Sequence, residues 1–403
     1  MHEGLTYLQL GAISTRFKID RFSLILVAIE IIYNSMRALF IIITSIHGLI
    51  HLMGFAKAYN LAELSQLTKP ISKLNGILWL LCTLLFFIAL LLFLVRNDEW
   101  WIIGAVAIIL SQIVIIYSWT DAKFGTIANV IIFVPIIVSF MGALPSSFMN
   151  VYNTEVEKKL HNPSNIPILL EEDIQHLPNP VTKYLYYVGA VGKPIIINFK
   201  VISSGKMKFN IEANWMDINS QQYNFYNYPS RFFYIQSKIF GVPFDGLHIF
   251  NDNMATMQIK VASLVKVVDA SGKEMNQSET VTFFNDLCLF APAGLVDKAI
   301  LWRSIDSLTV EATYSNKEST IKAMLYFNQK GELINFVSNY RYQSMDGKVY
   351  DNYKWSTPIK DYREFDGRKI PTYGEAIWHK PEGAFTYAIF NLKEIDFNTE
   401  GYK

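Results

Sequence analysis

The sequence predicts an α + β protein, in which an N-terminal bundle of four transmembrane helices precedes a large curved antiparallel β-sheet. Two observations predict this fold class. Four apolar stretches that lack Asp, Glu, Lys and Arg crowd into the first part of the 403-residue chain. After Lys193 the sequence instead alternates between apolar and polar residues, with turn residues at short intervals. We expect an N-terminal extension over 1–35, a transmembrane domain over 36–148 and a soluble β domain over 149–403.

Each apolar stretch is long enough to cross a membrane as a helix. The four stretches are Ala38–Phe55, Gly76–Val95, Trp101–Trp119 and Thr126–Leu144. About 20 residues in a helix cross about 30 Å of hydrocarbon, and a helix satisfies its own backbone hydrogen bonds. We therefore expect a multi-pass membrane protein. Pro135 in the fourth stretch indicates either a local kink or a proline that the membrane helix simply tolerates.

The first 35 residues do not fit this pattern. Phe22–Tyr33 is apolar but too short to span, and polar residues separate it from the first long stretch. Met36, followed by Arg37 and an apolar helix, is typical of the start of a membrane protein. We expect Met36 to be the initiator and 1–35 to lie upstream of it. The alternative is that 1–35 contributes an interfacial helix or an additional short helix.

Basic residues between the apolar stretches indicate the orientation in the membrane. Four spans place both ends of the chain on one side. The loops on the opposite side carry Lys57, Lys69, Lys73 and Lys123. Because loops rich in Lys and Arg stay in the cytoplasm, we expect the soluble domain outside it. This bias disappears if basic residues of 1–35, or those just after the last span, are counted.

His47 and His51 are the intramembrane polar candidates. They lie four residues apart in the first span, so both imidazoles share one face of the helix. Ionisable side chains inside a membrane usually face the bundle interior and are candidates for function. A functional reading would need further ligands for a metal or a proton path. The simpler interpretation is a neutral pair that hydrogen-bonds to neighbouring helices and packs the bundle.

The chain from Ile195 to Phe397 has the pattern of antiparallel strands with one buried face. Apolar and polar residues alternate along 320–327 and again along 384–389. Turn residues such as Ser204-Gly205 and Asp366-Gly367 recur between such segments. We expect about eleven or twelve strands. They would form one large curved sheet, an incomplete barrel.

One helix interrupts the strands at Ser278–Phe290. Its apolar residues follow helical spacing, and Asn276, Gln277 or Ser278 could cap its N-terminus, with Glu279 in the first turn. We expect this helix to cover the concave face of the sheet. One side would be apolar and the other side polar. The apolar positions are Val281, Phe284, Leu287 and Cys288, and the polar positions are Ser278, Glu279, Asn285 and Asp286.

Several segments of the β domain resemble a widespread bacterial family known only as a domain of unknown function. They include NPVTKYLYYVGAVGKP, ANWMDINSQQYNFYNYPSRFFY, APAGLVD and DYREFDGRKIPTYGEAIW, within Pro178 to about Phe397. The domain also resembles, more weakly, the lipoprotein-carrier fold of the LolA and LolB kind. That resemblance implies an incomplete barrel with a helix over its apolar concave face. Since the family is bacterial and the chain has four apolar stretches, we expect a multi-pass protein of the bacterial inner membrane. The family brings no catalytic residues.

Composition and motifs exclude several classes of function. The net charge of +1 gives no general attraction to nucleic acid. Cys82 in the second span and Cys288 in the β domain form no disulfide framework. The β domain shows no metal-ligand spacing, phosphate-binding loop, dinucleotide fingerprint or nucleophile elbow. We expect no cofactor, no metal and no nucleic-acid partner.

Aromatic residues of the strands and apolar residues of the inserted helix are the candidate ligand contacts. An open barrel of this size either encloses an apolar pocket or needs a plug. Such residues are typical of a packed core and of a ligand wall, which are the same surface in a half-barrel. The candidates are Trp215, Phe284, Leu287, Trp302, Trp355 and Trp378.

Three functions remain open at this point. The first is a binding module that holds or carries a membrane lipid or the acyl chain of a lipoprotein. The second is an envelope hydrolase that uses carboxylates such as Glu279, Asp361, Glu364 and Glu375. The simpler interpretation of these carboxylates is strand-surface charge or a pairing with Arg363 or Arg368. The third is a purely structural membrane protein. Because no catalytic motif is present, we favour the binding module.

Overall fold

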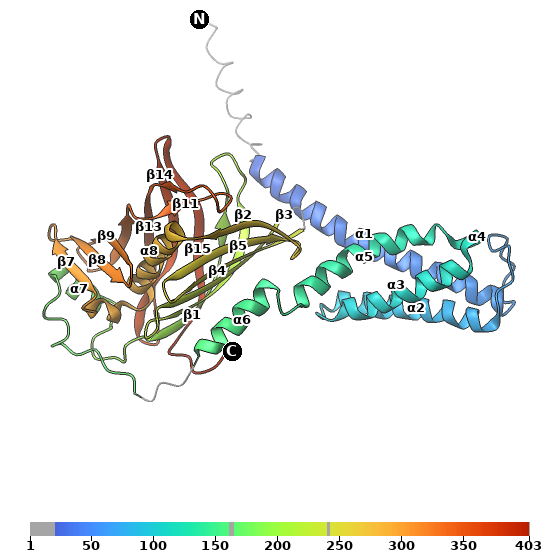
Figure 1. The fold of residues 1–403 in the computed structure, drawn as a ribbon, viewed down its shortest axis with the longest axis horizontal. Helices are drawn as coiled ribbons and strands as arrows, with labels where there is room; N and C mark the ends of the chain where they lie inside the picture. Colours follow the sequence, from blue (N-terminus) through green and yellow to red (C-terminus); the bar gives the residue numbers. More distant parts are fainter. Residues whose placement is uncertain (1–20, 161–164, 240–241, 403) are drawn as a thin grey trace, which may run out of the picture. The chain divides into compact units, whose positions relative to one another are not determined.

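The computed structural model describes residues 21–160, 165–239 and 242–402. The chain divides into two compact units, Met1–Phe140 and Met141–Lys403. Figure 1 shows the helices of the first unit and the strands of the second. Helix α5 runs past the boundary and ends in the second unit.

The first unit consists of helices. They are α1 (Arg21–Ala58), α2 (Lys73–Leu94), α3 (Trp100–Tyr117), the short α4 (Trp119–Ala122) and α5 (Gly125–Ala143). The prediction of four long apolar helices is confirmed, because four helices are long and apolar enough to cross a membrane. Helix α1 begins at Arg21 and continues without a break into the first span. Residues 1–20 of the predicted extension lie outside the described part of the chain.

The helices of the first unit pack tightly against one another and keep apolar side chains on their outer surface. Phe86, Ala107 and Ile132 are buried in the bundle core. A Cβ atom on Gly54 would lie 2.0 Å from the Trp79 ring, so only glycine allows α1 and α2 to approach this closely. Exposed Ile, Leu, Val and Phe side chains recur along all four long helices. Such an apolar exterior fits a lipid environment better than water.

The second unit is built on one large antiparallel sheet, preceded by helices α6 (Phe148–Lys159) and α7 (Asn179–Tyr187). Its strands pair in the order β6-β5-β4-β3-β2-β1-β15-β14-β13-β10-β9-β8-β7. The bounds of the first half are β1 (Asn198–Met207), β2 (Met216–Phe225), β3 (Ser230–Ile239), β4 (Val242–Asn251), β5 (Met254–Val261) and β6 (Val265–Ser271). Those of the second half are β7 (Ile300–Ser304), β8 (Thr309–Asn316), β9 (Ser319–Phe327), β10 (Leu333–Ser338), β13 (Lys354–Phe365), β14 (Arg368–Lys380) and β15 (Gly383–Phe397).

The sheet is open, with β6 and β7 as its two edges. The first and last strands of the domain, β1 and β15, pair at its centre. The predicted incomplete antiparallel barrel is therefore confirmed. Thirteen strands form this sheet, slightly more than expected, and the two-residue strands β11 (Tyr342–Gln343) and β12 (Asp351–Asn352) form a separate pair.

Helix α8 (Lys273–Phe290) lies inside the curve of the sheet (Figure 1), where it contacts strands of both halves, including β5 and β9. The prediction of a helix against the concave face is therefore correct. On its apolar side, Phe284 is fully buried and stacks on Tyr314 of β8, with ring centroids 4.9 Å apart. Tyr184 of α7 donates a hydrogen bond to the carbonyl of Cys288 across 2.8 Å. A short 3₁₀ helix, Pro292–Val296, follows.

The predicted N-terminus of this helix was wrong. Helix α8 begins five residues earlier, after Gly272, whose φ of 100° suits glycine, and Glu274 rather than Glu279 occupies the first turn. Ser278, expected as a cap, lies inside the helix and donates its hydroxyl to the carbonyl of Glu274 across 2.7 Å. Thr282 bonds back to the carbonyl of Ser278 in the same way, at 3.1 Å. A hydroxyl satisfied inside the helix cannot serve as its cap.

The polar side of α8 is buried as deeply as the apolar side. Ser278, Glu279, Asn285 and Asp286 are all buried. A helix that covers a sheet from outside would leave its polar face in water. Helix α8 is instead enclosed by the curved sheet, so its polar residues need partners from the strands.

Candidate functional site

Two adjoining cavities lie between the polar side of α8 and the sheet. Each has a volume of about 180 Å³. They share six lining residues, which therefore stand where the cavities meet. These residues are Met207, Phe233, His248, Glu279, Arg341 and Tyr387.

Asp286 is held by three donors from neighbouring strands. Its Oδ2 atom accepts hydrogen bonds from Arg231 Nε and Gln222 Nε2, both at 2.7 Å, and from Asn224 Nδ2 at 3.2 Å. Arg231 on β3 and the two amides on β2 point to the concave face. The ring of Phe233 lies 4.7 Å from the Arg231 guanidinium carbon. A buried carboxylate is retained at such a site because each donor offsets part of its lost hydration.

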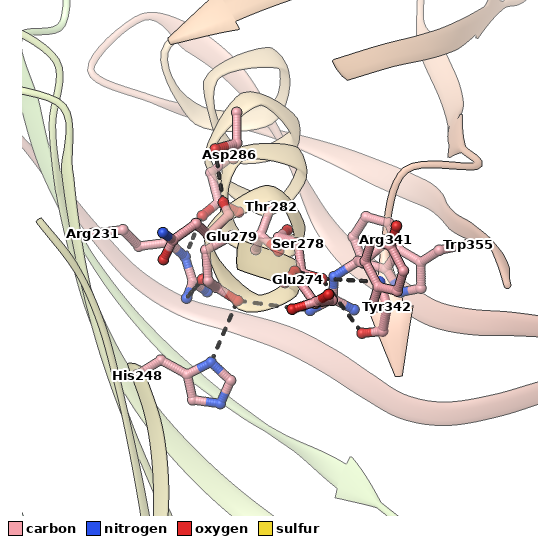
Figure 2. Close-up of polar contacts among 12 residues, drawn as sticks. Arg231, His248, Glu274, Ser278, Glu279, Thr282, Asp286, Arg341, Tyr342 and Trp355 are labelled. Atoms are coloured by element: carbon pink, nitrogen blue, oxygen red, sulfur yellow. Dashed lines mark hydrogen bonds and ion pairs between the residues drawn. The ribbon is translucent and has the colours of Figure 1, made fainter. Parts of the chain in front are cut away.

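Glu279 stands at the centre of three basic side chains (Figure 2). Its Oε2 atom lies 3.3 Å from Arg231 Nη1. Its Oε1 atom lies 3.5 Å from His248 Nδ1 and 3.9 Å from Arg341 Nη2. The side chain of Glu279 is only 1% exposed. These groups come from α8, β3, β4 and the segment before β11, so the fold assembles them from distant parts of the chain.

Arg341 is held between aromatic rings. Its guanidinium carbon lies 4.3 Å from the centroid of Trp355 and 5.2 Å from that of Trp378. Its Nη1 atom donates to the hydroxyl of Tyr387 at 2.9 Å. The segment that carries Arg341 is tied to α8, since the backbone N–H of Tyr342 donates to the Ser278 hydroxyl at 2.9 Å. These contacts therefore fix Arg341 where the two cavities meet.

Burial and charge act in opposite directions on the pKa values of this cluster. Burial alone would raise the pKa of Glu279, but the contacts with His248, Arg231 and Arg341 outweigh it and lower this pKa to about 2. Burial raises the pKa of Asp286 despite the charge of Arg231. Burial also lowers the pKa of His248, against the effect of Glu279. At neutral pH the imidazole is therefore uncharged and Glu279 is ionised.

Three polar atoms of this cluster lack a hydrogen-bond partner among the described residues. They are Glu279 Oε1, His248 Nδ1 and Arg341 Nε. A buried polar atom without a partner carries a desolvation penalty of about 1–3 kcal/mol. All three belong to residues that stand where the cavities meet. A polar group of a ligand bound there would supply the missing partners.

Away from this polar centre the cavity walls are largely apolar. The first cavity is lined by strands β1, β13, β14 and β15 and by the end of α8, through Val201, Leu289, Phe290, Ile359, Ala376 and Leu392. The second is lined by strands β4, β5 and β6 and the start of α8, through Phe244, Met257, Ile259, Val268 and Met275. An apolar cavity with a few converging polar groups is the usual form of a small-molecule site.

Residues 167–390, more than half of the chain, match the model of a family of unknown function, DUF6544. The chain belongs to the DUF6544 family. The resemblance noted from the sequence is therefore confirmed. No curated protein matches this DUF6544 protein.

Solved structures similar to the DUF6544 protein include proteins of the LolA kind. An outer membrane lipoprotein-sorting protein domain from Vibrio parahaemolyticus is 12% identical, with a TM-score of 0.30, over 50% of this chain and 86% of that one. A LolA superfamily protein from Nitrosomonas europaea is 9% identical, with a TM-score of 0.31, over 54% and 93%. A DUF1329 family protein from Desulfovibrio piger is 9% identical, with a TM-score of 0.27, over 54% and 91%. At these identities and TM-scores, we interpret the site from the side chains of this chain and not from the solved structures.

Two of the six predicted ligand contacts of the DUF6544 domain line the cavities. Trp355 lines the first cavity and Trp378 the second, and both contact Arg341. Phe284 and Leu287 pack into the core on the opposite side of α8. Trp302 lies on the edge strand β7, and Trp215 lies before β2, under the ammonium of Lys208. A ligand-binding role for these residues stays a prediction.

Of the four carboxylates singled out in the sequence, two line a cavity and two are exposed on the surface. Glu279 and Glu375 line the first cavity, and Glu375 accepts a hydrogen bond from the Tyr373 hydroxyl at 2.8 Å. Asp361 and Glu364 are exposed on β13. The exposed Asp361 and Glu364 fit the expected surface charge. For Glu279, the expectation of surface charge or a pairing with Arg363 or Arg368 was wrong, because this buried carboxylate pairs with Arg231 of β3.

Sequence reasoning missed Arg231, His248 and Arg341. A signal was present for Arg231, because Arg231, Phe233 and Ile235 lie two residues apart and so share one buried face of β3. A charge on the apolar face of a strand needs a buried partner, and this is a recognisable mark of a site. Arg341 gave no such signal, because it lies in the irregular segment before β11.

The long apolar helices of the DUF6544 protein contain a second polar cluster. His47 Nε2 lies 2.9 Å from Asn129 Oδ1 and 3.2 Å from Ser111 Oγ. His51 Nε2 lies 3.0 Å from the same Ser111 hydroxyl, and its Nδ1 bonds to the His47 carbonyl at 2.8 Å. These bonds join α1, α3 and α5. They favour the interpretation that the histidines hold the bundle together.

Proposed function

We propose that the β domain binds a lipid or the acyl chain of a lipoprotein in the two cavities around α8. The spans would hold the protein in the bacterial inner membrane, with the β domain outside the cytoplasm. The observation that carries this proposal is the pair of adjoining cavities, whose walls are largely apolar and whose meeting point is polar. An amphiphile has the same division between chain and head group.

The apolar walls account for the affinity that such a ligand needs. Each methylene moved from water into an apolar site contributes about 0.8 kcal/mol. Ten buried methylenes would contribute roughly 8 kcal/mol before the losses of rotational and conformational freedom are subtracted. The aromatic lining at Trp355, Trp378 and Phe390 provides rigid contact area without the loss of many rotamers.

The contacts of the buried carboxylates favour binding over hydrolysis. A general acid or base works best when its pKa lies near the working pH. The pKa of Glu279, which burial alone would raise, is lowered to about 2 by its basic neighbours. Burial raises the pKa of Asp286, but its Oδ2 atom already accepts three hydrogen bonds and is not free to take part in proton transfer. Glu279 and Asp286 are therefore suited to hold the neighbouring basic side chains in place.

Lipid retained during purification tests the proposal. Full-length protein extracted in mild detergent is washed, and lipid that remains bound is identified by mass spectrometry. Ala376 lines the first cavity and Ala384 is exposed on the neighbouring strand β15. Ala376→Trp should reduce retained lipid at least about fivefold, because the indole fills the cavity. Ala384→Trp should retain as much lipid as the wild type. Equal retention by both variants would refute binding in this cavity.

A further inference from the structure

The charged side chains that line the two cavities balance one another. Three are cationic, three are anionic, and burial keeps His248 uncharged at neutral pH. The cations are Lys208, Arg231 and Arg341, and the anions are Glu279, Asp286 and Glu375. An ionised head group would therefore add an uncompensated charge to a buried site, where its lost hydration is not replaced.

The buried atoms that lack hydrogen-bond partners indicate which donors and acceptors the head group should have. Glu279 Oε1 can only accept a hydrogen bond, and Arg341 Nε can only donate one. A hydroxyl both donates and accepts, so a single hydroxyl can satisfy both atoms. A phosphate monoester offers acceptors to Arg341 but would bring negative charge against Glu279, which is 1% exposed and ionised.

The cavities extend in two directions from this polar centre. One lies towards β13 and β14, and the other towards β4 and β5. Glu279, His248 and Arg341 line both of them. A ligand with a polar group at its middle and an apolar chain on each side matches this arrangement.

We infer that the ligand is an uncharged lipid of the diacylglycerol class, with its hydroxyl at Glu279 and Arg341 and one acyl chain in each cavity. This inference rests on the proposed function and adds the charge and shape of the ligand. The charge balance selects against anionic phospholipids, and the two cavities select for two chains.

Photo-crosslinking of the full-length protein in phosphatidylcholine nanodiscs tests the inference. The two probes are a diacylglycerol and the phosphatidic acid with the same diazirine-bearing chains, so that they differ only in the phosphate. Labelled peptides are identified by mass spectrometry. Diacylglycerol should label cavity peptides, such as those with Trp355 or Leu289, at least about tenfold more than phosphatidic acid.

The other outcomes separate this inference from the proposed function. Equal or stronger labelling of the cavity by phosphatidic acid would overturn the uncharged head group and leave lipid binding intact. Labelling confined to the spans with both probes would overturn lipid binding as well.

Removal of one negative charge provides a second readout. Glu279→Gln leaves the cavity with an excess positive charge. The labelling of cavity peptides by phosphatidic acid, relative to that by diacylglycerol, should therefore rise about tenfold. Glu274→Gln on the same helix is the matched control, since Glu274 does not line either cavity. It should leave the ratio unchanged. If Glu279→Gln fails to fold, the comparison of the two probes on the wild type still decides whether the cavity prefers an uncharged head group.

Discussion

Arg231 on β3 donates from Nε to Asp286 Oδ2 on α8 across 2.7 Å, and both side chains are more than nine-tenths buried. This bond joins the sheet to the helix that it encloses. It also neutralises a carboxylate that faces a cavity. The same guanidinium lies 3.3 Å from Glu279, so one cation supports two buried anions.

Loss of the Arg231 charge should therefore destabilise the domain strongly. Arg231→Met removes the cation and leaves Asp286 and Glu279 uncompensated, at an expected loss of about 3–5 kcal/mol in unfolding free energy. Thermal or denaturant unfolding of the full-length protein, followed by circular dichroism of the strands, measures the loss. Arg303→Met breaks the exposed pair with Glu311 and should change stability far less. Similar losses in both variants would contradict the role of the buried pair.

Phe284 should contribute to stability rather than to the cavity. It is fully buried between Tyr314 and Phe336, on the side of α8 away from both cavities. Phe284→Ala should cost about 3–5 kcal/mol in unfolding free energy, because it leaves a void in a packed core. Leu301→Ala on the surface of β7 should stay within about 0.5 kcal/mol. A small loss at Phe284 together with altered lipid retention would instead indicate a mobile lid.

The cluster at Glu279 should make stability depend on pH. Burial lowers the pKa of His248, so the unfolded chain binds a proton that the folded chain does not. Stability should therefore fall as the pH drops below about 6.5. The contribution of Glu279, whose folded pKa is about 2 against 4.5 for the ordinary group, is lost in turn between these two values. Asp286, with its raised pKa, acts in the opposite direction.

His248→Gln isolates the first part of this dependence. The glutamine cannot take up a proton, so the difference in melting temperature between about pH 7 and about pH 5 should shrink. Arg231, Arg341 and Glu279 face the imidazole and remain in this variant. His176→Gln, at an exposed position, is the control and should keep the full difference. An unchanged difference in His248→Gln would refute the assignment.

Reporter fusions test the predicted orientation. Because the Lys-bearing loops are expected in the cytoplasm, alkaline phosphatase fused after Lys403 should be active and the same enzyme fused after Lys123 inactive. A cytoplasmic reporter should give the opposite pair of results. Activity of the cytoplasmic reporter after Lys403 would place the β domain in the cytoplasm.

The histidine pair should prove structural. If His47 and His51 only join helices, changing both to Gln should leave membrane insertion and abundance nearly intact, because glutamine keeps a polar partner for Ser111. Bound metal or haem in purified wild type that disappears in this double variant would overturn the prediction. Elemental analysis and an absorption spectrum of the purified protein decide between these outcomes.

The sequence revealed the architecture because each of its elements leaves a local pattern. Twenty apolar residues in a row have few explanations other than a span, and alternation along 320–327 marks a strand whatever it pairs with. The helix followed from its spacing, and its position over the concave face was also implied by the resemblance to the lipoprotein-carrier fold. Its start at Lys273 did not, because Ser278 and Thr282 bond inside the helix instead of capping it.

The site could not be assembled from the sequence, because its members lie far apart in the chain. Arg231 and Glu279 are 48 residues apart and meet only when the sheet curves around α8. Trp355 and Trp378 were recognisable as strand aromatics, but a core aromatic and a cavity aromatic have the same pattern. The burial of the polar side of α8 depends on strands from both halves of the sheet, which no local pattern reports.

The pairing of β1 with β15 has a consequence for how the protein is made. These neighbours are the first and last strands of the sheet, so ribosomes synthesise β1 long before its partner exists. Until β15 emerges, β1 is an unpaired edge and the two halves of the sheet cannot join around α8. Folding must wait for nearly the whole chain, and contacts this distant in sequence are formed slowly. The nascent domain therefore spends this interval with its cavity walls unassembled.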